Sequence, residues 1–496
     1  MMKVKWKYLL IATAVLALVA CSTQGKRETA SGATISDAKI EVSGYEWGPS
    51  VSGVIVELSE KVSDLSPDGL TVLTADVKRT VKDAYLSDEK GQKVDGPSQF
   101  AKLDLDVIYT FGGKDNASPF FFNLKTMMNE WAAEYPVQIK GLAIGNKSLD
   151  FETDAIKKRV MNDTAAFNVR GEHKGTYANP LTGTTEELAL QYAAYEPEKL
   201  RKSDAKSSLI IWLHGQGEGG TDIDITLLGN EVTALTRDNI QQYYTATGDT
   251  SEKGAYVLAV QTPTYWMDEG DGSNGGGAGK SRYTEVLMDT IEAYVASNPD
   301  IDRNRIYLGG CSNGGYMTMN MAVEYPGYFA AAYPLAEAYS FYAYQRNADG
   351  TYAKEESSDG TTSSFIPTGQ TFLTEDKIEK LKNLPLWFVM SADDQVVLPE
   401  RYVLPTYQAL VQAGAKNAWL SYYETVQGQD IPENQYLGHW SWLYFFNDQV
   451  TGVQDVEQVK SASDLASAYT PSNADHGGTS KASHATIFEW MNAQSK

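Results

Sequence analysis

Cysteine is scarce in this sequence. The 496 residues include two, Cys21 and Cys311. Cys21 belongs to a segment that we expect to be modified during export, which leaves Cys311 as the one internal thiol. An internal disulfide is therefore excluded. Stability has to come from the burial of apolar side chains, and a chain of this length can form cores large enough for that.

Basic residues are also few. The chain has 42 Lys and Arg against 64 Asp and Glu, and its formal net charge is −22. A surface of this sign repels phosphate backbones, so we expect no nucleic-acid partner. The sequence has no internal repeats either. The length exceeds that of one usual core, and two domains are the starting expectation.

Histidine is the third scarce residue type. There are five in the chain, at positions 173, 214, 439, 476 and 484. No group of these with cysteine or acidic residues has the spacing of a metal site. The acidic stretches at 221–224 and 268–272 do not match the EF-hand loop, and solvated acidic turns are commoner. We expect no required metal and no cofactor.

The amino-terminal segment has the pattern of an export signal. Three lysines at positions 3, 5 and 7 precede an apolar run over 8–19, and Leu18-Val19-Ala20-Cys21 closes it. This resembles a bacterial lipoprotein signal over 1–20, with lipid attached to Cys21. An ordinary secretory signal or a lone membrane anchor is the alternative. The expectation is an exported protein, anchored by lipid to a bacterial membrane on its non-cytoplasmic side.

The rest of the chain divides by pattern. Residues 21–37 are polar and indicate a flexible tether. Short alternating stretches over 38–150 predict an all-β, immunoglobulin-like sandwich, with a short helix over 126–135. Residues 151–187 contain breaking glycines, among them Gly171 and Gly175, and predict a connecting segment.

Residues 188–496 alternate strands with helices, which is typical of an α/β domain with a mainly parallel sheet. Residues 345–372 are rich in Gly, Ser, Thr and charge. They indicate either an insertion near the substrate entrance or a surface loop. Expected strands lie at 188–194, 209–213, 256–260, 305–308, 330–334, 386–390 and 419–423; expected helices lie at 239–244, 283–296, 315–324, 401–413 and 484–493.

One motif carries the strongest functional information. An apolar strand over 305–308 leads into Gly310-Cys311-Ser312-Asn313-Gly314, and we expect a helix to follow. This order of strand, G-x-S-x-G turn and helix predicts a nucleophile elbow, which exposes one serine hydroxyl at a strained turn. A motif centred on Cys311 would lack the second glycine. Ser312 is therefore the expected nucleophile, and Cys311 a small buried neighbour.

A serine nucleophile needs a base and an acid that orients it. In this fold class both follow the serine, the acid before the histidine. His439, His476 and His484 satisfy that order. His439 is favoured because Gly438-His439-Trp440 follows a late strand, although the other two stay open. For the acid, Asp394 after the strand at 386–390 is preferred to Asp393 because it lies three residues before Val397.

The third requirement is an oxyanion hole. The apolar strand at 209–213 runs into His214-Gly215-Gln216-Gly217-Glu218. We expect the backbone N–H groups of Gln216 and Asn313 to face the reacting carbonyl. Gly215, Gly217 and Gly220 also match G-x-G-x-x-G, but the elbow decides against a dinucleotide site. No Lys-Ser/Thr follows, as a phosphate loop requires. His214 is expected to be structural.

These stretches, together with Gly438-His439-Trp440-Ser441-Trp442, resemble the α/β-hydrolase group of prolyl-oligopeptidase-like or predicted peptidases. That group includes bacterial esterases with an amino-terminal immunoglobulin-like domain. The resemblance covers about 188–496 and implies acyl transfer through Ser312, Asp394 and His439.

The leading hypothesis is a lipid-anchored serine carboxylesterase acting on short acyl esters, with acetyl or aryl esters on carbohydrate as candidate substrates. An oligopeptidase using the same triad on short peptides is the second hypothesis. The third is a catalytically inactive binding lipoprotein with a hydrolase fold.

Overall fold

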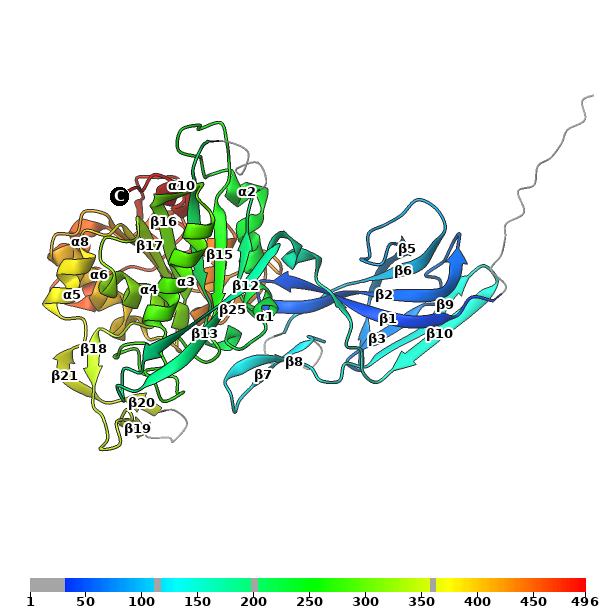
Figure 1. The fold of residues 1–496 in the computed structure, drawn as a ribbon, viewed down its shortest axis with the longest axis horizontal. Coiled ribbons are helices and arrows are strands. Elements are labelled where there is room, and N and C mark those ends of the chain that lie inside the picture. The colour runs from blue at the N-terminus through cyan, green and yellow to red at the C-terminus, as the bar shows by residue number, and fades with distance from the viewer. Residues whose placement is uncertain (1–31, 111–116, 198–203, 357–362) are drawn as a thin grey trace, which may run out of the picture.

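The computed structural model describes residues 32–110, 117–197, 204–356 and 363–496. They form two domains that lie end to end along the long axis of the molecule (Figure 1). The expected lipid site at Cys21 and the signal over 1–20 lie outside the described residues, as does most of the tether. In the described part of the chain, no helix is both long and apolar enough to span a membrane.

The amino-terminal domain is a sandwich of two sheets, as predicted. One sheet has the order β11 (Arg159–Val160), β1 (Ile35–Tyr45), β2 (Gly48–Val62), β6 (Ser98–Leu105) and β5 (Val81–Ser87). The other has the order β10 (Lys147–Thr153), β9 (Val137–Ile144), β3 (Thr71–Thr74) and β4 (Val77–Arg79). Alternating apolar side chains such as Val54, Val56 and Leu58 are fully buried between the sheets. The core therefore forms from one face of each strand.

A hairpin stands apart from this sandwich. Strands β7 (Phe120–Asn123) and β8 (Met128–Trp131) pair in an antiparallel arrangement and project beneath the contact between the domains (Figure 1). The short helix predicted over 126–135 is therefore wrong. Phe120 of β7 lies directly opposite Trp131 of β8, and their ring centroids are 4.4 Å apart. Such aromatic pairs stabilise a hairpin, and the sequence of β8 alone did not reveal the pairing.

The second domain is built on an eight-stranded sheet, confirming the predicted α/β-hydrolase class. Its order is β12 (Val169–Ala178), β13 (Thr185–Tyr195), β15 (Tyr256–Gln261), β14 (Ser207–Leu213), β16 (Ile301–Cys311), β17 (Ala331–Leu335), β22 (Leu386–Ser391) and β23 (Ala418–Tyr423). The strands from β15 to β23 pair in parallel, and β12 and β13 are antiparallel. Six of the seven expected strands fall inside one of these elements, and the seventh, over 330–334, begins one residue before β17.

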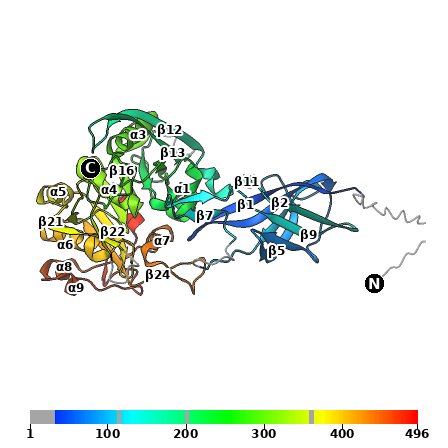
Figure 2. The same cartoon turned by 90° about the horizontal axis from the view of Figure 1, so that it is seen from below.

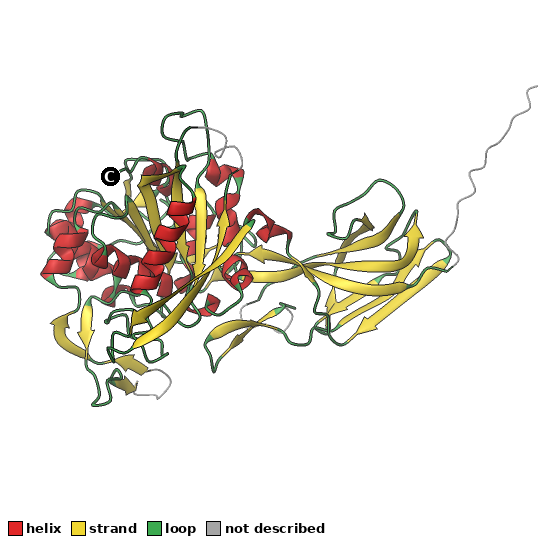
Figure 3. Ribbon diagram, viewed as in Figure 1, coloured by secondary structure: helices red, strands yellow, loops and turns green. Residues whose placement is uncertain are grey.

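Helices cover both faces of this sheet (Figures 2 and 3). They are α1 (Ile223–Gly229), α2 (Asp238–Gln241), α3 (Thr284–Ser297), α4 (Asn313–Glu324), α5 (Glu375–Leu381), α6 (Val403–Gln412), α7 (Trp442–Phe446), α8 (Val456–Ser461), α9 (Leu465–Ala468) and α10 (Ile487–Asn492). Expected helices at 283–296, 315–324 and 401–413 correspond to α3, α4 and α6. Those at 239–244 and 484–493 form only in part, as α2 and α10.

Strand β12 occupies a segment that we expected to be a connection. Its glycines do not break the strand. A side chain at Gly171 would overlap the Tyr192 ring, and one at Gly175 would overlap the Tyr177 ring. These glycines therefore make room for tyrosine rings on an edge strand, and the sheet begins at Val169 rather than near Leu188.

The described parts of the stretch at 345–372, residues 345–356 and 363–372, belong to a β-rich arm. Strand β18 (Tyr342–Tyr344) pairs with β21 (Pro367–Thr371), and β19 (Lys354–Glu356) pairs with β20 (Ser363–Phe365). The arm projects on the same side of the sheet as the β7–β8 hairpin (Figure 1). Arg346 and Tyr352 of the arm both contact Glu269, which attaches the arm to the loop after β15.

Short elements complete the fold. They are β24 (Val426–Gln427), β25 (Gln435–Tyr436), β26 (Gly452–Val453), β27 (Ser480–Lys481), and the 3₁₀ turns η2 (Asn162–Ala166), η4 (Gln216–Glu218), η5 (Val232–Thr236), η6 (Pro399–Arg401) and η7 (Gly438–Trp440). One side chain joins the two cores directly: Leu228 of α1 is fully buried within the apolar cluster of the sandwich.

Candidate active site

The turn between β16 and α4 has the geometry of a nucleophile elbow. Ser312 adopts φ 54° and ψ −111°, a conformation that non-glycine residues rarely adopt. A Cβ at Gly310 would lie 2.8 Å from Leu213 Cβ, and one at Gly314 would lie 2.6 Å from the His214 carbonyl oxygen. Both glycines are therefore required by close packing, as the motif predicted. The strain is held by a 2.9 Å hydrogen bond from the Ser312 N–H to the Leu335 carbonyl.

The three side chains singled out from the sequence lie in one hydrogen-bonded line. Ser312 Oγ is 2.9 Å from His439 Nε2, and His439 Nδ1 is 2.8 Å from Asp394 Oδ2. Asp394 is fully buried, His439 is 7% exposed and Ser312 is partly exposed. The hydroxyl that would react therefore faces the surface while its partners are shielded. This is the geometry of a Ser-His-Asp triad.

The structure separates the two adjacent aspartates. Asp394 Oδ1 accepts hydrogen bonds from the N–H groups of Val396 at 2.8 Å and Val397 at 2.9 Å, which leaves Oδ2 for His439. Asp393 instead contacts the Ser391 hydroxyl, and its Oδ2 accepts from Gln435 Nε2 at 3.2 Å. The preference for Asp394 agrees with this arrangement.

Cys311 is fully buried beneath the elbow. Its Sγ lies 3.6 Å from Asn230 Oδ1. Burial raises the pKa of the thiol well above its ordinary value, so a reactive thiolate is disfavoured there. The Cys311 side chain packs in the core, and the exposed nucleophile of the turn is the hydroxyl of Ser312.

The remaining histidines lie in other surroundings. His476 and His484 both line a cavity of about 600 Å³ between residues 451–452 and 474–485, which contains none of the triad residues. His214 is fully buried, its Nδ1 2.6 Å from the Gly215 carbonyl and its Nε2 3.1 Å from the Thr262 N–H. Burial lowers the pKa of His214 to about 4. This ring is therefore neutral and structural, as expected.

Both predicted oxyanion donors stand at the first position of a helical turn. Gln216 begins η4 and Asn313 begins α4. The first N–H groups of a helix have no acceptor within it and carry the positive end of its dipole. The side chains of these two residues are joined through Asn274, whose amide bonds Gln216 Oε1 at 2.8 Å and Asn313 Nδ2 at 2.7 Å. The arrangement suits an anionic oxygen beside Ser312.

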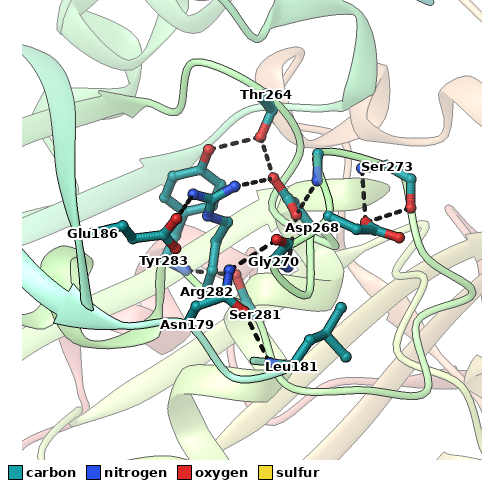
Figure 4. A network of polar contacts seen from close by, with 12 residues as sticks. Asn179, Leu181, Glu186, Thr264, Asp268, Gly270, Ser273, Ser281, Arg282 and Tyr283 are labelled. Atoms are coloured by element: carbon teal, nitrogen blue, oxygen red, sulfur yellow. Dashed lines mark hydrogen bonds and ion pairs between the residues drawn. The ribbon is translucent and has the colours of Figure 1, made fainter. Parts of the chain in front are cut away.

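Asn274 comes from the loop between β15 and α3, which a buried network holds in place (Figure 4). Asp268 is fully buried; its Oδ2 accepts from Thr264 Oγ1 at 2.8 Å and from Arg282 at 3.3 Å. Its Oδ1 accepts from the N–H groups of Gly270 and Gly272. Both oxygens of Asp268 therefore accept hydrogen bonds from the protein, in the positions where a cation would have to bind. The acidic turn at 268–272 is stabilised by these hydrogen bonds.

The second acidic stretch is accounted for in the same way. Asp222 caps α1 by accepting from the Asp224 N–H at 3.1 Å, and Asp224 pairs with Arg170 at 2.7 Å. Across the ranges that the structure describes, no three or more His, Cys, Asp or Glu side chains gather as a metal site would require.

The amino-terminal domain contacts the oxyanion loop, which the sequence did not indicate. Asn129 Nδ2 of β8 donates to Glu218 Oε1 at 3.1 Å, and Trp131 Nε1 donates to Asp222 Oδ2 at 2.8 Å. Gln216 Nε2 donates to the Met127 carbonyl at 3.4 Å. Glu218 is buried, and burial raises its pKa to about 7. The hairpin β7–β8 is thus hydrogen-bonded to the loop that carries Gln216.

The same domain also contacts the segment that precedes His439. Glu46, in the turn between β1 and β2, is 2% exposed and accepts from the N–H groups of Gln429 and Asp430. Trp47 stacks between Tyr45 and Tyr109 with centroids 5.0 and 4.9 Å away. Tyr109 in turn lies 6.3 Å from Trp440, the residue after His439. The β7–β8 hairpin and the turn between β1 and β2 therefore contact two different segments of the candidate site.

The comparisons with known proteins agree with this two-part architecture. Residues 37–147 match the Esterase Ig-like N-terminal domain, and residues 273–452 match the Prolyl oligopeptidase family. The first range lies within about three residues of the predicted sandwich.

Three individual relatives illustrate the likeness. A 71-residue stretch is 38% identical to poly(3-hydroxyalkanoate) depolymerase C of Paucimonas lemoignei; it covers 14% of this chain and only 16% of that protein. A crystal structure of a thermostable esterase superposes with a TM-score of 0.56 at 20% identity, over 84% of this chain and 97% of that one. Pyrococcus horikoshii acylaminoacyl peptidase superposes with a TM-score of 0.32 at 14% identity, over 79% and 51%.

The likeness to the thermostable esterase supports the fold alone, and the family matches cover the elbow and both triad partners. Together with the sandwich match they describe the domain order of the chain. A segment similar to the Ig-like domain of esterases precedes an α/β-hydrolase domain, part of which is similar to the Prolyl oligopeptidase family.

Proposed function

We propose that the protein is a carboxylesterase that cleaves short acyl esters through an acyl-enzyme on Ser312. One observation supports this above the others: Ser312, His439 and Asp394 form a continuous hydrogen-bonded line at a strained elbow. In this mechanism His439 Nε2 takes the Oγ proton as Oγ attacks the ester carbonyl carbon. Asp394 holds the ring with Nε2 toward the serine and stabilises the imidazolium that forms.

The tetrahedral intermediate then carries a negative oxygen, which the N–H groups of Gln216 and Asn313 stabilise. His439 returns its proton to the leaving alcohol oxygen, and the bond from the carbonyl carbon to that oxygen breaks. Water attacks the acyl-enzyme in the second half, again losing its proton to His439. The acid is released and the Ser312 hydroxyl is restored.

The ester is preferred to the peptide bond as substrate because of the amino-terminal domain. The matching domain family is named for esterases, and the thermostable esterase superposes over 84% of this chain. The alternative is an oligopeptidase, which the Prolyl oligopeptidase family match of residues 273–452 favours.

One pair of substrates tests the choice. The same N-acetylalanyl group is presented as its p-nitrophenyl ester and as its p-nitroanilide. We expect turnover of the ester and none of the anilide above the Ser312→Ala background. Efficient anilide cleavage that Ser312→Ala abolishes would establish the peptidase instead.

We also propose that the enzyme works outside the cytoplasm, held at a bacterial membrane by lipid on Cys21. The support is the pattern of lysines, an apolar run and Leu18-Val19-Ala20-Cys21 in the sequence. Its test is given in the Discussion.

A further inference from the structure

The β7–β8 hairpin carries an unusual set of exposed apolar side chains. Phe121 is 47% exposed, Phe122 45%, Leu124 80% and Met127 40%. Exposed apolar side chains gathered on one short element mark a surface that contacts something apolar. The hairpin borders the candidate active site through Gln216, so the apolar surface belongs to the surroundings of that site.

Its two phenylalanines lie on opposite faces. Phe122 pairs directly with Asn129, and Phe121 pairs with Glu130. Residues directly opposite in an antiparallel pair project from the same face. Asn129 bonds Glu218 of the oxyanion loop, so the Phe122 face is turned toward the catalytic domain. Successive side chains of a strand project from opposite faces, so Phe121 and Glu130 project from the face turned away from the catalytic domain.

Phe122 reaches the oxyanion loop itself. Its ring comes within 3.7 Å of the position that a Cβ on Gly217 would take. Gly217 follows Gln216, the proposed donor of one oxyanion hydrogen bond. Although the ring lies this close to the loop, 45% of the residue remains exposed. It therefore presents apolar surface to the space above the oxyanion loop.

The chemistry of the tetrahedral intermediate determines which substrate group occupies that space. The leaving oxygen has to face His439 Nε2, which protonates it, and the oxyanion faces Gln216 and Asn313. The remaining substituent on the carbon is the acyl chain. It extends away from His439, past the oxyanion loop, against which Phe122 of the hairpin lies at Gly217.

We propose that Phe122, a residue of the amino-terminal domain, forms the wall of the acyl-binding subsite and sets the preference of the enzyme for the apolar acyl chain of its ester. This inference rests on the proposed esterase function. It makes the Ig-like domain a direct contributor to specificity, and the subsite is shared between the two domains.

The test compares acyl chains on one leaving group. kcat/KM is measured with p-nitrophenyl acetate, butyrate and hexanoate for the wild type, Phe122→Ala and Phe121→Ala. We expect Phe122→Ala to lower kcat/KM for the hexanoate by about tenfold and to leave the acetate within about twofold, since an apolar pocket discriminates at this level. Phe121→Ala is the matched control, with similar exposure on the opposite face, and we expect it to match the wild type on all three esters.

Three outcomes overturn the proposal. In the first, Phe122→Ala leaves kcat/KM for the hexanoate at the wild-type value. In the second, it lowers kcat/KM for all three esters equally, which would mean that the ring only supports the oxyanion loop. In the third, a series of acetate esters with different alcohols is compared, and the loss of kcat/KM in Phe122→Ala depends on the size of the alcohol. Failure of the esterase function is recognised separately, because wild type would then show no acetate turnover that Ser312→Ala removes.

Discussion

The carboxylate of Glu46 accepts a 2.6 Å hydrogen bond from the N–H of Gln429, although the two residues belong to different domains. Glu46 lies in the turn that ends β1, and Gln429 lies between β24 and the segment that leads to His439. The side chain is 2% exposed and also accepts from Asp430 N–H at 3.1 Å. Because a buried carboxylate is stable only when its oxygens are bonded, this contact joins the sandwich to the catalytic domain in one defined geometry.

Replacing Glu46 is expected to loosen the joint between the domains. Glu46→Ala removes the charged acceptor of the Gln429 and Asp430 N–H groups, and the loss of these charge-assisted hydrogen bonds lowers the free energy of unfolding by about 2 kcal/mol. The measurement is urea unfolding followed by tryptophan fluorescence. Glu89→Ala, at an exposed position of the same domain, is the control and should unfold at the wild-type midpoint. Equal midpoints for all three proteins would contradict the role of Glu46.

The two adjacent aspartates give a sharper test of the triad. Asp394→Asn keeps the side-chain shape but removes the charge that orients His439, and we expect a loss of about 10⁴ in kcat. Asp393→Asn touches Ser391 and Gln435 instead, so it should retain activity within about tenfold of wild type. Both are compared by initial rates with p-nitrophenyl acetate. A larger loss in Asp393→Asn than in Asp394→Asn would reassign the acid.

Glu337 should make the stability depend on pH. It follows β17, is fully buried, and accepts from the Tyr339 N–H at 2.6 Å. Burial raises its pKa to about 8, against about 4.3 in an unfolded chain. Between these values the folded state holds the proton and the unfolded state does not. The free energy of unfolding therefore falls as pH rises through this window, by up to about 1.4 kcal/mol per pH unit from this group.

Glu337→Gln removes that dependence. The variant and wild type should have similar stability near pH 4, and the variant should become progressively more stable than wild type up to pH 8. Thermal unfolding at intervals across this range measures the difference, with Glu89→Gln as the exposed control. A constant difference between Glu337→Gln and wild type at every pH would refute the assignment.

Lipid attachment is tested at Cys21. Cys21→Ser should release the protein from membranes into the soluble fraction, because the acylated thiol is the proposed anchor. The measurement is membrane fractionation of cells that produce the full chain, with detection of the protein by antibody. Cys311→Ser serves as the control for the loss of a thiol and should remain with the membranes. Unchanged fractionation of Cys21→Ser would refute lipid anchoring.

The catalytic fold could be predicted because its strands are short apolar runs. Leu209–Leu213 and Leu386–Met390 read as strands from composition alone, since parallel strands are buried on both faces. The β7–β8 hairpin could not be predicted in this way. Its strands are four residues each and depend on each other and on the oxyanion loop. β12 was missed for a related reason, since its glycines have a purpose only beside Tyr192 and Tyr177.

The triad residues were identifiable because the fold class orders them along the chain and only three histidines follow Ser312. Asp394 differs from Asp393 by its place in a turn, which the register of Val397 already indicated. The contributions of Glu46, Phe122 and Asn129 had no sequence signal. They arise where one domain packs on the other, and contacts between distant segments leave no local pattern.

The identity of the nucleophile is the claim on which the mechanism depends. A fluorophosphonate probe reacts with an activated serine hydroxyl and leaves a covalent adduct that peptide mass spectrometry can locate. The wild-type protein without residues 1–21 should carry one adduct, on Ser312, and should lose its p-nitrophenyl acetate turnover in step with labelling. Ser312→Ala should take no label, stay folded, and fall in kcat by about 10⁶. An adduct on another residue, or undiminished turnover in Ser312→Ala, would contradict the mechanism.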